Sequence, residues 1–520
     1  ISSYGDIESI SYNKDNLISQ IVNINSLSIK YDYINDVSFK VRKMSEIGRQ
    51  GTIGNTLEFS YNLFDTKVLD NKGLINTYIF NEYGNVIGIT SLDEQNDLKN
   101  AYGKSYSFDG CDASQNKLTS DKSLIKYVDN LVDDSSFESG TSFRFKSTHM
   151  DNTNIATKSY TRSGEYSLEV EIPRGGESVY KEFKVEKGKK YTFSAYIRGM
   201  SYSIEDESPL DLFLYYDNSY EVTHISELTD DFVRYSVSID YDINATDDLK
   251  VVIRNMSAEH NGFYLDDIQL EEGEVANYYN IIDNSGLKNG LLDWTINKSN
   301  LADDFVDIVN VKDEVKALRI HSAPQGYVSA DRKFNIKGKK GDVFNFSFWY
   351  KNDAIIPSGG EGLMPGLWGT IFFGYPEDTE YGACVPAKYL NVGSDNWQFF
   401  SENFIAEDDY EYLEIKVNSF GGANECYLTN FSLFKDLECF SFDYDENGNL
   451  VSSSDLSKQK NEINYDKNNQ LIKLSDTMGA NFTFEYDNKV SDKVINSISP
   501  SGITNNIEYD VNGNPIKIKV

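Results

Sequence analysis

The stretch Phe-Asp-Tyr-Asp-Glu-Asn-Gly-Asn-Leu, residues 442–450, decides how the ends of this chain fold. Its core pattern, an aromatic residue or isoleucine, any residue, then Tyr-Asp, returns three times, at 463–466, 484–487 and 507–510. The four tyrosines, at positions 444, 465, 486 and 509, follow one another at 21, 21 and 23 residues. Such regular spacing indicates a repeat architecture in which each unit packs on its neighbour.

Each copy predicts a strand followed by a tight turn. Apolar residues at every second position form one face of the strand, and the aspartate is placed to accept hydrogen bonds from turn amides. Gly448 and Gly513 occupy the position that needs a positive φ, and Asn469 replaces them in the second copy. The third copy has no glycine there, so its turn after Asp487 is expected to differ.

Related pieces occur near the start of the chain, at 12–17, 31–32 and 80–86, so both ends belong to one repeat system. The pattern resembles the YD repeats of Rhs proteins, relatives of which include teneurins and the cocoon-forming subunits of Tc toxins. This resemblance implies a long β-sheet wound into a hollow shell that commonly encloses a C-terminal toxin. No such toxin domain or cleavage motif occurs in these residues, so the segment is expected to be part of a shell wall. A solenoid or spacer without cargo is the alternative, and periodicity alone does not separate the two.

A second duplication lies between the repeats. Residues 130–140 align with 280–290 at an offset of 150, whereas 264–270 align with 427–433 at an offset of 163. Two tandem domains follow, the second longer by 163 − 150 = 13 residues. The sequence therefore predicts four segments: repeats at 1–129, domains at 130–279 and 280–436, and repeats at 437–520.

Both domains show short alternating strands separated by polar turns, a pattern typical of antiparallel sandwiches. In the first copy the expected strands are Tyr166–Ile172, Tyr191–Ile197, Leu210–Tyr216 and Phe232–Ile239. The only helix candidate is Leu92–Ala101. The predicted fold class is all-β, with two tandem jelly-roll sandwiches flanked by YD-repeat sheet segments.

Three motifs of the first copy, at 137–140, 187–194 and 263–267, resemble jelly-roll carbohydrate-binding modules. In such modules a calcium ion often ties the first loop to the last strand. The matching residues here are Glu138 and Asp266, with the Gly140 carbonyl nearby, and hard oxygen ligands suit calcium.

The second copy has Lys288 and Thr429 where the first has the two acidic side chains. Calcium is therefore predicted in the first sandwich and not in the second. The alternative is that Glu138 is a turn residue and Asp266 a solvated strand end, since a chain with 82 acidic residues contains many chance pairs.

Sugar binding requires flat aromatic rings beside hydrogen-bonding groups. Along the strand 346–350, alternation puts Trp349 opposite the phenylalanines, and Tyr196 holds the corresponding place in the first copy. The glycine-rich insertion 357–376 carries Trp368 and is expected to fold over a ligand. Trp349, Trp368 and Tyr196 are thus the predicted carbohydrate-binding residues. The alternative is that the tryptophans only pack, which is the expectation for the remaining two, Trp294 and Trp397.

Composition excludes several classes of function. Lys and Arg total 49 against 82 Asp and Glu, a net charge of −33 that disfavours nucleic acid and anionic lipid as partners. With 39% hydrophobic residues the chain is globular, and it lacks an apolar run long enough to span a membrane. It begins at Ile1 without a leader, as expected of an internal segment of a longer protein. The four cysteines show no CxxC spacing, which predicts isolated thiols.

No HExxH, GxSxG or phosphate-binding loop occurs, and the four histidines stand alone, so no enzymatic activity is predicted. Our interpretation is a non-catalytic, secreted or wall-associated segment that forms part of a shell. Its expected partners are a cell-surface or cell-wall glycan and a toxin cargo encoded elsewhere in the protein. The alternative is a glycan-binding surface adhesin whose repeats form only a stalk.

Overall fold

The computed structural model describes residues 7–520 apart from several gaps. The gaps are 24, 26, 36–37, 63–64, 82, 93–97, 99–100, 110–115, 123–124, 141–143, 206–208, 300, 313–314, 353–365, 376–387, 390–393, 422–424, 436, 438, 456–458 and 488–492. The chain forms two compact units, one of residues 1–125 with 437–520 and the other of residues 126–436.

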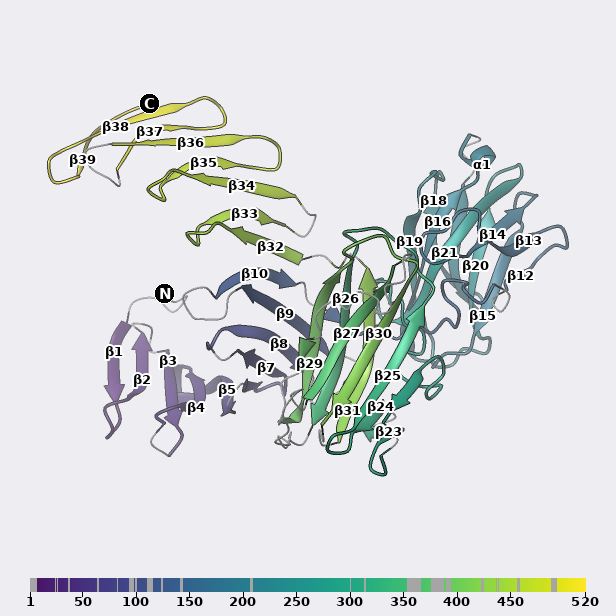
Figure 1. Ribbon diagram of the computed structural model, residues 1–520, viewed down its shortest axis with the longest axis horizontal. Helices are drawn as coiled ribbons and strands as arrows, with labels where there is room; N and C mark the ends of the chain where they lie inside the picture. Colours follow the sequence, from purple (N-terminus) through teal and green to yellow (C-terminus); the bar gives the residue numbers. More distant parts are fainter. Residues whose placement is uncertain are drawn as a thin grey trace. The chain divides into compact units, whose positions relative to one another are not determined.

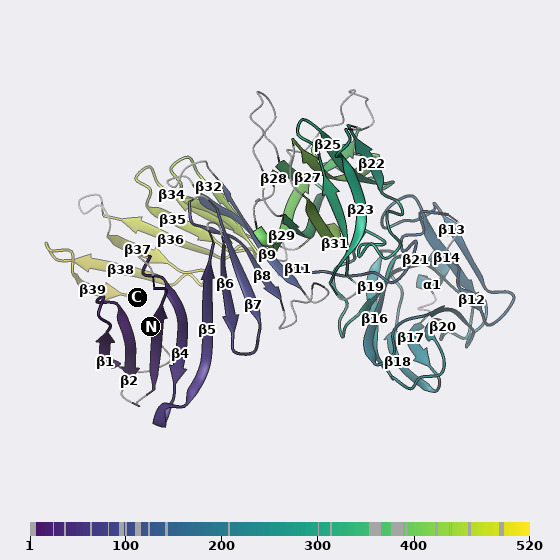
Figure 2. The same ribbon diagram turned by 90° about the horizontal axis from the view of Figure 1, so that it is seen from below.

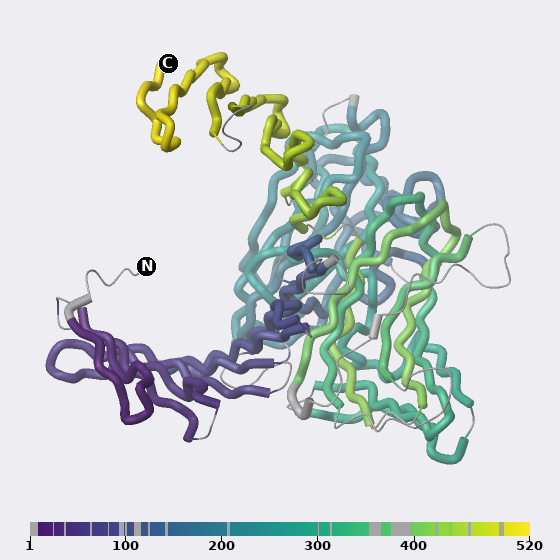
Figure 3. Tube along the Cα trace, turned by 60° about the vertical axis from the view of Figure 1, so that its left-hand side comes forward, coloured from purple at the N-terminus to yellow at the C-terminus, as the bar shows by residue number. Residues whose placement is uncertain are grey.

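The first unit is one 19-stranded sheet in which antiparallel strands follow one another in chain order (Figure 1). Its N-terminal strands are β1 Ile7–Tyr12, β2 Ile18–Asn23, β3 Ser28–Tyr33, β4 Val41–Ile47, β5 Ile53–Tyr61, β6 Asp65–Asp70, β7 Ile75–Phe80, β8 Val86–Leu92, β9 Tyr102–Asp109, β10 Lys117–Lys122 and β11 Ile125–Lys126. Its C-terminal strands are β32 Cys439–Tyr444, β33 Leu450–Ser454, β34 Lys460–Tyr465, β35 Leu471–Ser475, β36 Asn481–Tyr486, β37 Val494–Ile498, β38 Thr504–Tyr509 and β39 Pro515–Lys519. Figure 3 shows the C-terminal strands as a succession of hairpins.

Strand β10 is the point at which the two halves of this sheet join. It pairs with β9 on one side and with β32 on the other, where Ser120 lies opposite Ser441 and Lys122 opposite Cys439. The sheet thus continues directly from β10 to β32, although more than 300 residues separate these strands in the sequence. Both ends of the chain therefore share one sheet.

The repeat turns have the geometry that the sequence predicts. Asp445 Oδ1 accepts hydrogen bonds from the backbone N–H groups of Asn447 at 3.0 Å and Asn449 at 2.8 Å. Asp466 and Asp510 do the same in their own turns. The positive-φ positions are Gly448 at 79°, Asn469 at 62° and Gly513 at 78°. The turn after Asp487 lies outside the described residues.

The second unit contains two sandwiches, each of two five-stranded sheets (Figure 2). The first has sheet orders β12-β15-β20-β17-β18 and β13-β14-β21-β16-β19. The second has the same orders with every strand number raised by ten. The two sandwiches thus share one strand order, and together with the repeat sheet they confirm the all-β fold class.

The strands of the first sandwich are β12 Lys146–Ser147, β13 Thr153–Thr157, β14 Ser167–Ile172, β15 Ser178–Phe183, β16 Lys189–Gly199, β17 Leu210–Tyr216, β18 Ser219–Ile225, β19 Val233–Tyr241, β20 Leu249–Asn255 and β21 Asn261–Glu272. Those of the second are β22 Thr295–Lys298, β23 Phe305–Lys312, β24 Val315–His321, β25 Tyr327–Phe334, β26 Val343–Asn352, β27 Gly366–Gly374, β28 Lys388–Tyr389, β29 Ser394–Ile405, β30 Tyr412–Phe420 and β31 Cys426–Lys435.

One buried asparagine ties the first loop to the last strand in each sandwich. Asn130 Oδ1 accepts from the N–H groups of Val132 and Leu270, and its Nδ2 donates to the Ile268 carbonyl. Asn280 makes the same bonds to Ile282, Leu433 and Phe431. These partners reproduce both the 150-residue and the 163-residue offset of the sequence alignment.

Helix is nearly absent from the described residues, which contain α1 at Ser201–Glu205 and a 3₁₀ turn at Arg49–Gly51. The helix expected at 92–101 falls mostly outside them. No described helix is long and apolar enough to cross a membrane. Cys426 is buried and Cys439 half-buried, whereas Cys111 and Cys384 lie outside the described residues.

Candidate functional site

Trp368 lies on strand β27, inside a regular sheet. Its neighbours Leu367, Ile371 and Phe373 are buried in the core of the second sandwich, so alternation directs the indole to the outer face. There it is half-buried and pairs across the strands with Asn418 of β30. The sequence predicted that Trp368 lies in a loop folded over a ligand. This prediction was wrong, because Trp368 lies on a strand. Residues 357–365 and 376 of that insertion lie outside the described part of the chain.

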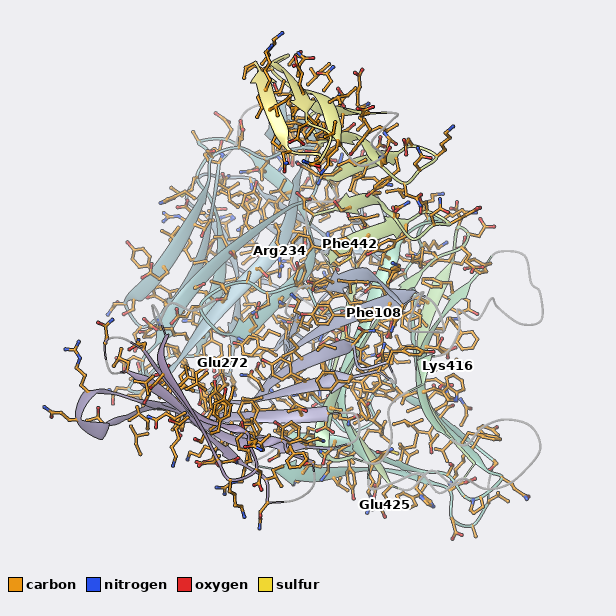
Figure 4. The ribbon with its side chains drawn as sticks, turned by 90° about the vertical axis from the view of Figure 1, so that its left-hand side faces the viewer. Phe108, Arg234, Glu272, Lys416, Glu425 and Phe442 are labelled. Atoms are coloured by element: carbon orange, nitrogen blue, oxygen red, sulfur yellow. The ribbon has the colours of Figure 1, made fainter. Side chains whose placement is uncertain are left out.

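The outer surface around this tryptophan combines aromatic and polar side chains, and we call it the Trp368 face. Lys416 Nζ lies 3.4 Å from Asp331 Oδ2, 3.0 Å from Glu414 Oε2 and 4.6 Å from the centre of the Phe372 ring. Figure 4 labels Lys416 on this sandwich. The Trp368 face consists of Trp368, Phe372, Asp331, Glu414, Lys416 and Asn418.

Two polar atoms of this face have no hydrogen-bond partner among the described residues, namely Asp331 Oδ1 and Asn418 Nδ2. The other Asp331 oxygen accepts from Asn297 Nδ2 at 2.8 Å. Buried polar atoms are nearly always paired in folded proteins, because an unpaired one costs about 1–3 kcal/mol. One unpaired acceptor and one unpaired donor beside a flat ring match the chemistry of sugar hydroxyls, which both donate and accept. Both atoms are themselves buried, so a sugar reaches them only when neighbouring side chains shift.

Trp349 occupies a different environment from the one expected. It faces away from Phe346 and Phe348, as alternation predicted, but its exposure is 0% and it packs on Phe399 with ring centres 5.3 Å apart. A buried ring offers no open face to a sugar. Alternation indicates on which side of a sheet a side chain lies, but it does not indicate what covers that side.

The ring of Tyr196 is also covered, in this case by two arginine side chains. The guanidinium carbon of Arg162 lies 3.6 Å from the centre of its ring, and that of Arg234, labelled in Figure 4, lies 5.6 Å away. Arg162 is held there by an ion pair with Asp267, whose side chain is fully buried. The stacked cation covers a ring surface that a sugar would need.

The other two tryptophans pack against the protein. Trp294 is buried against Phe431 with ring centres 5.0 Å apart, and it belongs to the core of the second sandwich. Trp397 is half-buried on edge strand β29, where Lys351 Nζ lies 5.7 Å from its ring centre.

Glu138 and Asp266, the predicted calcium ligands, meet at one loop. The Glu138 carboxylate accepts from the N–H groups of Glu165 and Tyr166 at 3.0 Å, and Asp266 accepts from those of Arg162 at 2.7 Å and Ser163 at 3.2 Å. These bonds occupy lone pairs that calcium would use. Among the described residues no group of three or more Asp, Glu, His or Cys side chains is arranged to hold a metal.

Burial shapes the electrostatics of this loop. It raises the pKa of Glu138 to about 7, against the backbone hydrogen bonds that lower it, and it holds the pKa of Asp266 well above its usual range. Gly164, at φ 66°, makes the close approach possible, because a Cβ there would lie 2.1 Å from Glu138 Oε1. No contact of the Gly140 carbonyl is recorded at this loop. The loop 162–166 itself thus bridges the two carboxylates.

Comparison with known proteins adds little beyond the fold. No known protein family and no curated protein matches the chain. The tandem CBM22-1–CBM22-2 domain of Xyn10C from Paenibacillus barcinonensis is 15% identical, with 60% of this chain and 98% of that one covered and a TM-score of 0.24. TmCBM61 in complex with β-1,4-galactotriose is 14% identical, over 30% of this chain and 98% of its own, at a TM-score of 0.21.

The CBM22-1–GH10 modules of Clostridium thermocellum Xyn10B, complexed with xylohexaose, are 14% identical over 30% of each chain, with a TM-score of 0.23. At such identities and TM-scores these similarities carry no argument about what this chain binds.

Proposed function

We propose that the second sandwich binds a glycan on the Trp368 face and that this segment acts by recognition and not by catalysis. The observation that carries the proposal is the half-buried Trp368 indole beside Asn418 Nδ2 and Asp331 Oδ1, which have no partners among the described residues. The ring supplies a surface for the C–H face of a pyranose, and the two unpaired polar atoms select hydroxyl positions once neighbouring side chains shift to admit the sugar.

Binding of the full chain to an array of plant, bacterial and animal glycans tests this function. Replacement Trp368→Ala is expected to abolish binding, and Asn418→Ala to weaken it about tenfold, because each removes a contact made only with the ligand. Trp397→Ala is the matched control, since it removes an equal ring from another sheet and is expected to leave binding unchanged. Loss of binding in the control alone would place the site elsewhere.

We infer in addition that the repeat sheet serves as part of an enclosing wall in an extracellular protein. This inference is supported by one face of the repeat sheet, on which cross-strand pairing places Ile463, Leu474 and Phe482 side by side. Several side chains of this apolar face are exposed to solvent, among them Phe482 with 44% and Ile518 with 61% of its surface exposed. Such a surface suits a wall that covers cargo, as YD-repeat shells do.

A stalk of a glycan-binding adhesin is the competing function for these repeats. A toxin domain on the same full-length polypeptide supports the wall, whereas cell-wall-anchoring repeats there support the stalk. Fractionation of the producing cells tests the extracellular location, and recovery of the intact protein only from the cytoplasm would contradict it.

We also propose calcium as a structural ion of the first sandwich, at Glu138 and Asp266. Its support is the donor set of two carboxylates on the first loop and the last strand, with pKa values raised by burial, since a cation relieves such charge. Calcium binding requires the backbone amides of residues 162–166 to release their hydrogen bonds to Glu138 and Asp266. Calcium is expected to raise the melting temperature of the chain and to lose this effect in Asp266→Asn. No shift in the unmodified chain contradicts the proposal.

A further inference from the structure

The first sandwich presents a face that corresponds, strand by strand, to the Trp368 face. In both sandwiches this face belongs to the sheet with order β12-β15-β20-β17-β18 or its counterpart ten strands on. Cross-strand pairs fix the matching positions. Arg254 lies opposite Asp211 as Asn418 lies opposite Trp368, and Lys250 lies opposite Tyr215.

Aromatic side chains gather on this face of the first sandwich. Tyr215 and Tyr220 are direct cross-strand partners, and the Phe213 and Tyr220 rings lie 5.8 Å apart edge to face. Tyr220 is 58% exposed, so one ring is open to solvent. Leu212 and Leu214, which alternate with these residues, are buried in the core. We call this surface the Tyr220 face, made of Phe213, Tyr215, Tyr220, Tyr180, Lys146, Lys250 and Arg254.

The charge of the two faces differs at matched positions. Where the second sandwich has Thr295, Glu414 and Asn418, the first has Lys146, Lys250 and Arg254, but where the second has Lys333 and Trp368, the first has Glu182 and Asp211. Glu182 and Asp247 offset the lysines, since Glu182 pairs with Lys146 and lies 3.7 Å from Lys250, and Asp247 lies 3.5 Å from Lys250. Arg254 is thus the cation of the Tyr220 face that neither Glu182 nor Asp247 offsets, in a protein whose net charge is −33.

Arg254 is the cation best placed for a ligand. It is exposed, and its Nε donates to the Gly176 carbonyl at 3.1 Å, which fixes the orientation of the guanidinium. Among the described residues it has no ion pair with a carboxylate. Its terminal nitrogens therefore present a planar fork of the kind that binds carboxylates and sulfates bidentately.

We propose that the Tyr220 face binds an acidic saccharide, a sugar polymer bearing carboxylate or sulfate groups. The sugar C–H face packs on Tyr220 and Phe213, while the anionic group pairs with Arg254. The tandem then has two faces of different specificity, one for an acidic polymer and one for the glycan proposed above. This second site does not depend on the glycan proposed for the Trp368 face.

Polygalacturonic acid and its fully methyl-esterified form test the proposal, because they share a backbone and differ in charge. The full chain is expected to bind the acid form, more weakly as salt rises, and not the ester. Arg254→Gln is expected to weaken binding about tenfold or more, and Tyr220→Ala to weaken it as well. The matched control Lys190→Gln removes one positive charge from the other sheet of the same sandwich and is expected to change nothing.

Three outcomes overturn the proposal: equal binding of acid and ester, equal losses in Arg254→Gln and Lys190→Gln, or loss of acid binding in Trp368→Ala. The last result would assign the acidic polymer to the second sandwich. Unchanged melting temperatures of the variants confirm folding. Arg254→Lys keeps the charge without the fork, and an affinity between those of the native chain and Arg254→Gln supports bidentate pairing.

Discussion

The Tyr444 hydroxyl donates a hydrogen bond to the Leu118 carbonyl at 2.9 Å, although 326 residues separate them in the sequence. The same bond recurs within the repeats. Tyr33 bonds to the Ile18 carbonyl, Tyr61 to Val41, Tyr486 to Leu471 and Tyr509 to Val494, all at 2.8 or 2.9 Å. Each tyrosine thus reaches the strand of the preceding hairpin, and Tyr444 does so across the inserted sandwiches.

Replacement of Tyr444 by phenylalanine tests the value of this bond. The ring stays and the hydroxyl is lost, so the free energy of unfolding of the repeat sheet is expected to fall by about 1 kcal/mol. Tyr465→Phe is the control, because its hydroxyl has no recorded bond in the described structure, and we expect a smaller effect. Equal effects in urea unfolding would contradict a specific role for the bond.

The register of β10 and β32 predicts that the sandwiches can be removed. Because Lys122 and Cys439 are cross-strand partners, replacing residues 123–438 by an Asn-Gly turn is expected to close a hairpin. The shortened protein is expected to show a β-type circular dichroism spectrum and one cooperative melt. An unfolded or aggregated product, with the native chain folded under the same conditions, would show that the repeats need the insert.

Glu138 predicts a pH dependence of stability. Burial raises its pKa from 4.5 to about 7 in the folded state, so folding favours the protonated carboxyl. The contribution of Glu138 to the free energy of unfolding is thus full below pH 4.5 and is lost as the pH rises to 7. Glu138→Gln is neutral and still accepts the amide bonds through its carbonyl oxygen. Its stability relative to the native chain is expected to rise between pH 5 and pH 8, and a pH-independent difference in chemical denaturation would contradict the assignment.

The paired asparagines Asn130 and Asn280 predict matched effects in the two sandwiches. Alanine at either position leaves two backbone N–H groups without their side-chain acceptor. It also leaves the Ile268 carbonyl in the first sandwich, and the Phe431 and Val128 carbonyls in the second, without the side-chain donor. Each replacement is expected to cost about 3 kcal/mol in the free energy of unfolding of its own sandwich. Differential scanning calorimetry checks this, and a marked loss for only one of the two would contradict equivalent roles.

The sequence predicted those features that depend on local chemistry or on self-similarity. The Asp445 turn, the positive φ of Asn469 and the tandem duplication needed only spacing and residue type. The prediction that Trp349 offers its ring to a sugar was wrong, because the burial of a side chain depends on what packs against its side of the sheet. Asp331 and Asn418 were missed, since strand pairing brings them to Trp368 from 368 − 331 = 37 and 418 − 368 = 50 residues away and nothing in their local sequence marks them.

Glycan binding by the full chain, compared with Trp368→Ala, tests the central claim most directly. The account predicts saturable binding to at least one glycan of the array, with loss in Trp368→Ala, retention in Trp397→Ala, and unchanged melting temperatures in all three proteins. Binding that survives Trp368→Ala unchanged, or a folded native chain that binds no glycan, would contradict it.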